Sequence, residues 1–222
     1  MRPTAHPLGL ERNIVAVSAV IFLLALGENL WKRFVPKYLE ALGAPVTAIG
    51  LFGSCQDLLD GVYQYPGGWI GNRYGRRRAL RVFVVLAAIG YAVYWWAPHW
   101  AFVFAGLAFV MAWSSMASPT LFAVVGDALP RERRAVGFTV QSILRRIPIA
   151  IAPTFGGLAI ATYGVIGGVH LGLALTLALA ALTLVAIRRV DIPVVLDDVP
   201  TNVVAVWRSL PTPLRWLLTQ TS

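Results

Sequence analysis

Charged residues are scarce in this chain. Asp, Glu, Lys and Arg make up 13% of its 222 residues and hydrophobic residues make up 58%, whereas ordinary soluble domains contain about 25% charged residues. This scarcity excludes an ordinary soluble domain. Several apolar runs reach the ~20 residues that a helix needs to cross a bilayer. The composition therefore predicts an all-α integral membrane protein.

Cysteine and the common motifs of enzymes are also lacking. The single cysteine, Cys55, excludes a disulfide framework within one chain. No Gly-x-Ser-x-Gly, no His-Glu-x-x-His and no phosphate-binding glycine loop occurs. We therefore expect a protein that is not an enzyme and that has no metal and no cofactor.

One enzymatic alternative is a membrane-embedded lipid phosphotransferase. Asp60-Gly61, followed by an arginine-rich stretch, is faintly similar to enzymes of that class, which bind a metal and a nucleotide diphosphate. Such enzymes need further aspartates at helical spacing on a neighbouring span. The next apolar segment, residues 82–96, contains none, so this alternative is disfavoured.

Basic residues are unevenly placed along the chain. The net charge is +9, but the arginines stand at the ends of apolar runs and do not form a nucleic-acid-binding face. With the N-terminus in the cytoplasm, fourteen Lys and Arg residues fall inside and three outside, which is the bias that sets membrane topology. We expect a multi-pass protein of the cell (inner or plasma) membrane, with both termini cytoplasmic, in contact with membrane lipid and not with nucleic acid.

The apolar runs predict six spanning helices. Their expected bounds are 13–38, 47–69, 82–96, 100–128 with an interruption at Ser118-Pro119, 135–163 and 164–187. Residues 1–12 would be a cytoplasmic lead and residues 13–189 the six-helix bundle. Residues 190–213 would form a cytoplasmic linker with a short amphipathic segment, and residues 214–222 the truncated start of a further helix.

The stretch between the second and third spans, residues 66–81, holds five arginines and four glycines. Its glycines predict a tight reversal and a close approach of backbones. Read as Gly68-x-x-x-Asn72-Arg73-x-Gly75-Arg76-Arg77, it resembles the loop between helices 2 and 3 of the major facilitator superfamily of transporters. The family has aspartate where this chain has Asn72. The resemblance implies that these six residues form a cytoplasmic gating loop.

Two further stretches resemble the same family. After the fourth span, Asp127, Pro130 and Arg134 fit its Asp-x-x-Pro-x-x-x-Arg-x-x-Gly pattern in the loop between helices 4 and 5. In the fifth span, Ala152-Pro153-Thr-Phe-Gly156-Gly157 is similar to the Gly-Pro-x-x-Gly-Gly segment of the family's antiporters, with alanine in place of the first glycine. We expect helix 5 to bend at Pro148, Pro153, Gly156 and Gly157.

The resemblance implies an architecture and a function. The architecture is the N-terminal half of a transporter, a six-helix bundle of the 3+3 inverted-repeat type, followed by the central loop and the start of helix 7. The function is secondary active transport of a small solute by alternating access, with H⁺ as the expected coupling ion. The missing C-terminal six-helix half, from the same gene or a second chain, is an expected partner. The alternative is a non-transporting membrane scaffold or partner subunit.

Ionisable residues inside spans mark the predicted pathway, because they are costly in lipid. Asp57 and Asp60 share one helix face with Gln64, near the middle of the second span. Arg145 and Arg146 lie at similar depth in the fifth span, with Gln141 one turn before Arg145. We expect Asp57 or Asp60 to pair with Arg145 or Arg146 across the cavity, or else to form a static lock between these helices.

Glu28 is the remaining candidate on the pathway. It precedes Lys32 by four residues near the outer end of the first predicted helix, an order that favours a helical salt bridge. Alternatively, Glu28 collects protons or binds substrate at the outer mouth. The substrate class stays open at this point, because the two arginines favour an anion whereas the two aspartates favour a cation or a proton.

Overall fold

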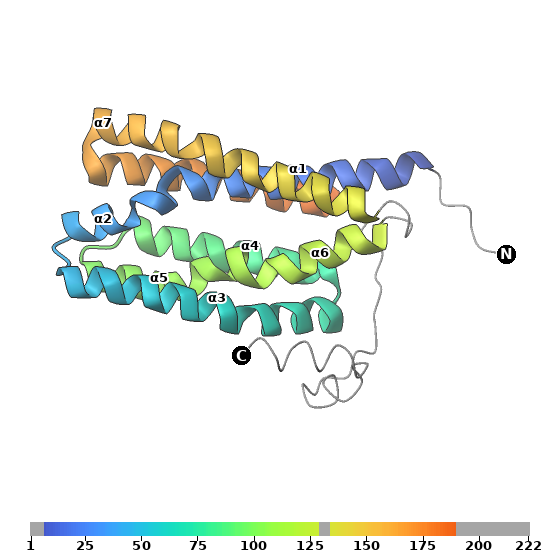
Figure 1. Cartoon of the computed structure of the whole chain (residues 1–222), viewed down its shortest axis with the longest axis horizontal. Coiled ribbons are helices and arrows are strands. Elements are labelled where there is room, and N and C mark those ends of the chain that lie inside the picture. Colours follow the sequence, from blue (N-terminus) through green and yellow to red (C-terminus); the bar gives the residue numbers. More distant parts are fainter. Residues whose placement is uncertain (1–6, 129–133, 190–222) are drawn as a thin grey trace, which may run out of the picture.

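The computed structural model describes residues 7–128 and 134–189, and side chains within 18–124 and 135–188. The described chain is helical and contains no strand, and its helices run alongside one another (Figure 1). The bounds are α1 Pro7–Trp31, η1 Lys32–Phe34, α2 Val35–Ala41, α3 Val46–Tyr74, α4 Arg76–Trp95, α5 Trp100–Met111, η2 Ala112–Met116, α6 Ala117–Ala128 and α7 Arg134–Arg189. The predicted lead before residue 7, the linker and the start of a further helix lie outside the described residues.

Three helical stretches of the described chain are long and apolar enough to cross a membrane: Arg76–Trp95, Trp100–Val124 and Ala135–Arg188. The last has 54 residues and would be about 80 Å long if straight, against a bilayer core of about 30 Å. It is not straight, because Gly164 has φ 74° and ψ 173°, a conformation that favours glycine. The chain folds back there, so that the two limbs of α7 lie side by side (Figure 1). This break falls at the predicted boundary between the fifth and sixth helices.

The first predicted helix is interrupted. It was expected to run from residue 13 to residue 38, but η1 separates α1 from α2. Pro36 lies in the first turn of α2. Proline has no N–H for the carbonyl four residues earlier, and its ring crowds that carbonyl. That carbonyl belongs to Lys32, which instead accepts from the Val35 N–H in the shorter 3₁₀ pattern.

The glycine- and arginine-rich stretch is helical and not the loop that its sequence predicted. α3 continues to Tyr74 and α4 begins at Arg76, so that Gly75, at φ 84°, is the one residue between them. Gly67 and Gly71 allow α3 to pack closely against η2 and α6. A Cβ at Gly67 would overlap the Met116 backbone, and one at Gly71 would overlap the Thr120 side chain.

The fourth predicted span contains a π-helical turn, and the interruption expected at Ser118-Pro119 is not formed, because both residues lie in the first turn of α6. η2 covers Ala112–Met116, directly before the predicted interruption at Ser118-Pro119. Pro119 has no N–H for the Ser115 carbonyl, and π turns of this kind often lie at functional sites. η2 packs against α3, because Ser115, which is only 1% exposed, donates a hydrogen bond to Asp60.

A cluster of aromatic side chains fixes α1 against α4 and the second limb of α7. The buried Trp31 ring meets Tyr91 and Tyr94 edge to face, at centroid distances of 5.6 and 5.5 Å. Its Nε1 donates to Thr176 Oγ1 over 3.1 Å. On the other side of α1, Gly156 lies so close to the Leu30 carbonyl that a Cβ there would overlap it. These contacts hold α1 between the two limbs of α7.

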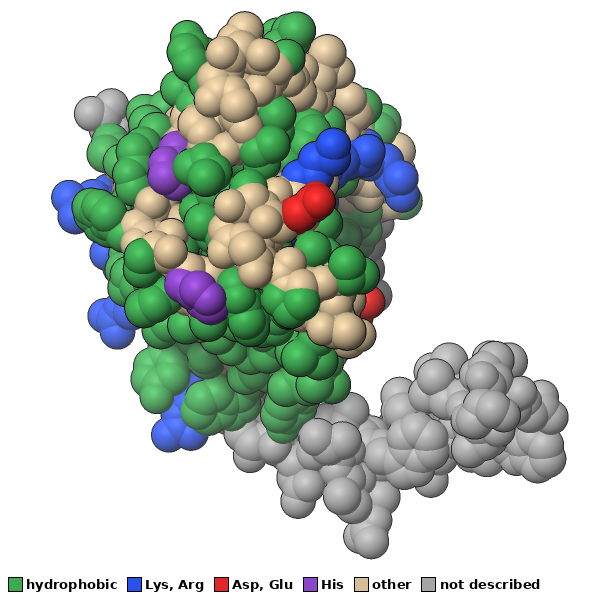
Figure 2. Space-filling view, turned by 90° about the vertical axis from the view of Figure 1, so that its left-hand side faces the viewer, with side chains coloured by type: hydrophobic (Ala, Val, Ile, Leu, Met, Phe, Trp, Pro, Cys, Tyr) green, Lys and Arg blue, Asp and Glu red, His purple; other side chains and the backbone are tan. Residues whose placement is uncertain are grey.

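The two ends of the bundle differ in charge. The end that carries α2 and the bend of α7 is mostly apolar or uncharged, with few basic side chains (Figure 2). Described basic residues gather at the opposite end, near Gly75 and the end of α7: Arg73, Arg76, Arg77, Arg78, Arg81 and Arg188. This asymmetry agrees with the charge bias along the sequence.

Candidate functional site

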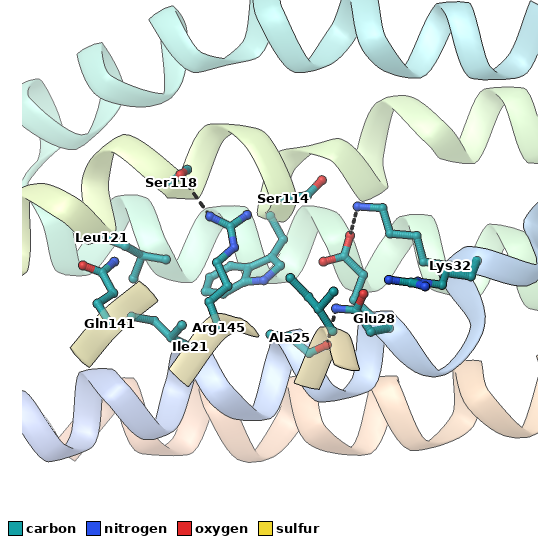
Figure 3. A pocket seen from close by; sticks show the side chains of 13 residues that line it. Ile21, Ala25, Glu28, Lys32, Ser114, Ser118, Leu121, Gln141 and Arg145 are labelled. Atoms are coloured by element: carbon teal, nitrogen blue, oxygen red, sulfur yellow. Dashed lines mark hydrogen bonds and ion pairs between the residues drawn. The ribbon is translucent and has the colours of Figure 1, made fainter. Parts of the chain in front are cut away.

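A pocket of about 300 Å³ lies between the α1–η1 segment, the η2–α6 segment and the first limb of α7. Its polar lining faces inward from these three elements (Figure 3). The polar residues are Glu28, Asn29, Lys32, Arg33, Ser114, Ser118, Gln141 and Arg145. The apolar residues are Ile21, Ala25, Trp113, Leu121 and Ile149. Three of the predicted pathway residues, Glu28, Gln141 and Arg145, thus share one pocket.

Glu28 lies well inside the helical segment formed by α1, η1 and α2. The Leu30 carbonyl packs against Gly156, which precedes the bend at Gly164 by eight residues, or about 12 Å of helix. Glu28 is therefore about 15 Å of helix from that end. Its assignment to the outer mouth stays a prediction.

The expected pair of Glu28 with Lys32 is formed. Lys32 Nζ lies 2.9 Å from Glu28 Oε1, and the two side chains are 32% and 7% exposed. Both residues line the pocket (Figure 3). A carboxylate with so little access to water is stabilised by an adjacent cation. The pair therefore places a compensated carboxylate on the pocket wall.

Arg145 reaches across the pocket from α7 toward α6. Its Nη1 donates to Ser118 Oγ over 3.4 Å (Figure 3). Among the described side chains it has no carboxylate partner. One turn earlier on α7, the Gln141 side chain is 6% exposed, and its Oε1 has no hydrogen-bond partner in the described chain. The pocket thus presents a guanidinium and an amide that are available to a solute.

Asp57 and Asp60 lie outside this pocket. Asp60 Oδ1 accepts from the Ser115 hydroxyl over 2.5 Å, and both aspartates are exposed. The one ion pair found among the described side chains is the one between Glu28 and Lys32. The expected pairing of Asp57 or Asp60 with Arg145 or Arg146 is therefore not formed. The aspartates and the arginines lie at similar depths along their helices. However, α3 packs against η2 and α6, whereas the expected pairing needed α3 to pack against α7.

The remaining pathway candidates are also placed. Gln64 lies on the exposed face of α3, and Arg146 is exposed on α7, outside the pocket. The side chains of Asp127 and Arg134, and Pro130 as a whole, lie outside the described residues. Sequence reasoning did not assign Asn29, Arg33, Ser114 and Ser118 to the site, although Ser114 and Ser118 are one helical turn apart and thus share a face.

The six residues of the predicted gating loop bracket the α3–α4 junction. Gly68, Asn72 and Arg73 are in α3, Gly75 is the junction, and Arg76 and Arg77 open α4. The Arg73 guanidinium lies over the Trp69 ring, 5.1 Å from its centroid. Arg76 is 5% exposed. Arg77 donates from Nε to the Ile187 carbonyl over 3.1 Å and from Nη2 to the Arg188 carbonyl. The junction is thereby fastened to the C-terminal end of α7.

The four residues at which a bend of helix 5 was expected lie within the first limb of α7. Pro148 and Pro153 are inside the helix, and the residue of α7 with non-helical dihedrals is Gly164. Gly156 allows the close contact with Leu30, whereas Gly157 is in ordinary contact with Phe34. The bend itself stays a prediction.

Comparison with known proteins identifies a family. The family model described as Major Facilitator Superfamily matches residues 17–219, which is most of the chain. Among curated proteins, none matches.

Proposed function

The chain belongs to the Major Facilitator Superfamily, whose members move solutes across membranes and are not enzymes, and on that premise we propose transport of a small solute by alternating access, through the pocket between α1, α6 and α7. The observation that carries this proposal is the convergence of Glu28, Gln141 and Arg145 in one pocket. Ionisable groups inside spans are costly, and they are retained where they serve a pathway.

We propose that the described helices form six membrane spans. α1 with α2 is the first, α3 the second, α4 the third, α5 through α6 the fourth, and the two limbs of α7 the fifth and sixth. The 3+3 inverted repeat follows from the family resemblance. Both termini are cytoplasmic, in the inner or plasma membrane, because the arginine-rich end of the bundle carries the N-terminal end of α1 and the C-terminal end of α7.

A second six-helix half, in the same chain or another, is the proposed partner. Asp57, Asp60 and Gln64 are exposed on α3. A Cβ at Gly50, Gly53 or Gly61 would meet nothing within 4 Å. Lipid does not tolerate a face with two carboxylates, so this face borders water or further protein.

Proton coupling is assigned to Glu28 in this proposal. It is the one acidic residue that is buried among the described side chains, and its protonation would release Lys32. The gate is the α3–α4 junction, where Gly75 supplies the hinge and the bonds of Arg77 to α7 supply a latch that opens and closes.

The test is the accessibility of the pocket from both sides of the membrane. Ser114→Cys, in a Cys55→Ser background, places one thiol in the pocket. A membrane-impermeant maleimide is applied to right-side-out and to inside-out vesicles that contain the full protein. Alternating access predicts labelling in both preparations, because the pocket opens to each side in turn. Val185→Cys, an exposed position on the second limb of α7, is the matched control and should resist labelling in lipid.

The scaffold alternative makes the opposite prediction. A protein that does not change conformation keeps its pocket open to one side or to neither. Labelling of Ser114→Cys from a single side would therefore refute alternating access.

A further inference from the structure

We propose that the pocket selects small organic anions, with Arg145 as the group that receives the acidic moiety. The inference rests on the proposed function, since it concerns the solute of the same site. It goes beyond that function because it settles the sign of the solute's charge, which the sequence left balanced between two arginines and two aspartates.

The side chains that line the pocket carry an excess of positive charge. The pocket has three cationic side chains, Lys32, Arg33 and Arg145, and one carboxylate, Glu28. The two aspartates that would have cancelled the arginines lie on α3, outside the pocket. Two positive charges are therefore in excess. In a cavity with low-dielectric walls such an excess attracts anions and repels cations.

The cationic side chains of the pocket differ in the partners that they have. Lys32 is held by Glu28 at 2.9 Å. Among the described side chains, the polar partner of Arg145 is the neutral Ser118 hydroxyl, at 3.4 Å, and Arg145 is exposed. A guanidinium stays protonated at all physiological pH values, so Arg145 keeps its positive charge. An arriving carboxylate or phosphate would supply the missing countercharge and accept two parallel N–H donors.

The other lining residues indicate what the solute carries besides its acidic group. Gln141, one turn from Arg145, is 6% exposed, and its Oε1 has no hydrogen-bond partner among the described residues. Trp113, Ile21 and Ile149 line the same space of about 300 Å³. Such a volume fits a small molecule with an apolar body and a few polar groups. The geometry thus describes an organic acid with a hydrogen-bonding substituent.

The experiment compares two thiol reagents of opposite charge on the same variant. Ser114→Cys in the Cys55→Ser background is treated with sulfonatoethyl methanethiosulfonate, an anion, or with trimethylammonioethyl methanethiosulfonate, a cation. Each rate is divided by the rate of the same reagent with a free small thiol. The normalised anion-to-cation ratio reports the potential in the pocket. We expect a ratio of about 10 or more.

Substitutions then assign the effect. Arg145→Gln should lower the ratio several-fold, Arg145→Lys should keep it, and Glu28→Gln should raise it. Arg146→Gln removes the same charge from the next residue, outside the pocket, and is the matched control that should leave the ratio near that of the parent. A ratio near or below one in the parent would overturn the proposal, as would equal effects of Arg145→Gln and Arg146→Gln.

Failure of this inference is distinguishable from failure of the proposed function. Labelling from both sides of the membrane with a ratio below one would keep alternating access and reverse the solute's charge. Labelling from one side with a high ratio would remove alternating access and leave an anion-binding pocket.

Discussion

Asp60 on α3 accepts a hydrogen bond from Ser115 in η2, with 2.5 Å between the oxygens. This contact joins an exposed carboxylate to a hydroxyl that is 1% exposed. It links α3 to η2, and no ion pair between Asp60 and Arg145 is found among the described side chains.

Loss of the Asp60 carboxylate should destabilise the bundle. In Asp60→Ala the Ser115 hydroxyl stays buried without its acceptor, which costs about 1–3 kcal/mol. Asp60→Asn keeps an acceptor oxygen and should lose less. The measurement is the midpoint of thermal unfolding in mild detergent. Asp57→Ala is the control, because the Asp57 carboxylate has no hydrogen bond in the described chain, and it should leave the midpoint nearly unchanged. An equal loss in both alanine variants would show that the bond between Asp60 and Ser115 does not stabilise the bundle.

The glycines of α3 divide into two groups that respond oppositely to alanine. Gly67→Ala places a methyl group on the Met116 backbone and should cost about 1–3 kcal/mol through overpacking. Gly61→Ala meets nothing within 4 Å and should be neutral or gain about 0.5–1 kcal/mol from helix propensity. The unfolding midpoints of the two variants should move in opposite directions. Similar midpoints would mean that α3 does not approach η2 as described.

Arg77 should protect the end of α7. Its bonds to the Ile187 and Arg188 carbonyls satisfy groups that have no partner within the helix. Arg77→Ala should speed amide hydrogen exchange in residues 183–188 by about tenfold or more, because both bonds are lost and each contributes about 0.5–1.5 kcal/mol. Arg78→Ala, at an exposed neighbour, is the control and should not change exchange there. Unaltered exchange in Arg77→Ala would remove the latch from the proposed gate.

The indole of Trp31 depends on Thr176. Thr176→Val replaces the hydroxyl with a methyl group of similar size, so the buried Nε1 loses its acceptor at a cost of about 1–3 kcal/mol. Thr176→Ser keeps the hydroxyl and loses only a methyl group, worth about 1 kcal/mol. The free energy of unfolding should therefore fall more in the valine variant. The reverse order would show that packing of the methyl group, and not the hydrogen bond, holds α1 to α7.

Much of the fold follows from the sequence. Apolar length and flanking charge predict α4 and both limbs of α7, and the glycines of residues 66–81 predict the tight reversal that the chain makes at Gly75. The break at η1 was missed, although Pro36 carries the signal for it. Gly71 lies beyond the predicted second span, and its helical state was not predicted, because glycine has low helix propensity. The close approach of Thr120 explains why glycine stands there.

The site was harder to predict than the fold. Helix depth placed Asp60 and Arg145 at the same level, but depth does not tell which neighbouring helix a side chain faces. From the sequence, Glu28 could form a salt bridge with Lys32 or lie at the outer mouth. Its position opposite Arg145 depends on the close contact of Leu30 with Gly156, a relationship between distant parts of the chain that one sequence does not reveal.

The most direct test of the central claim is a ligand screen on the purified protein. The unfolding midpoint is measured with size-matched sets of small organic acids, amines and neutral alcohols, because a ligand that binds the folded state and not the unfolded state raises the stability of the protein. Our account predicts that stabilising compounds are acids, that Arg145→Gln abolishes the shift, and that Arg146→Gln retains it. Stabilisation by amines or alcohols that persists in Arg145→Gln would contradict an anion site built on Arg145.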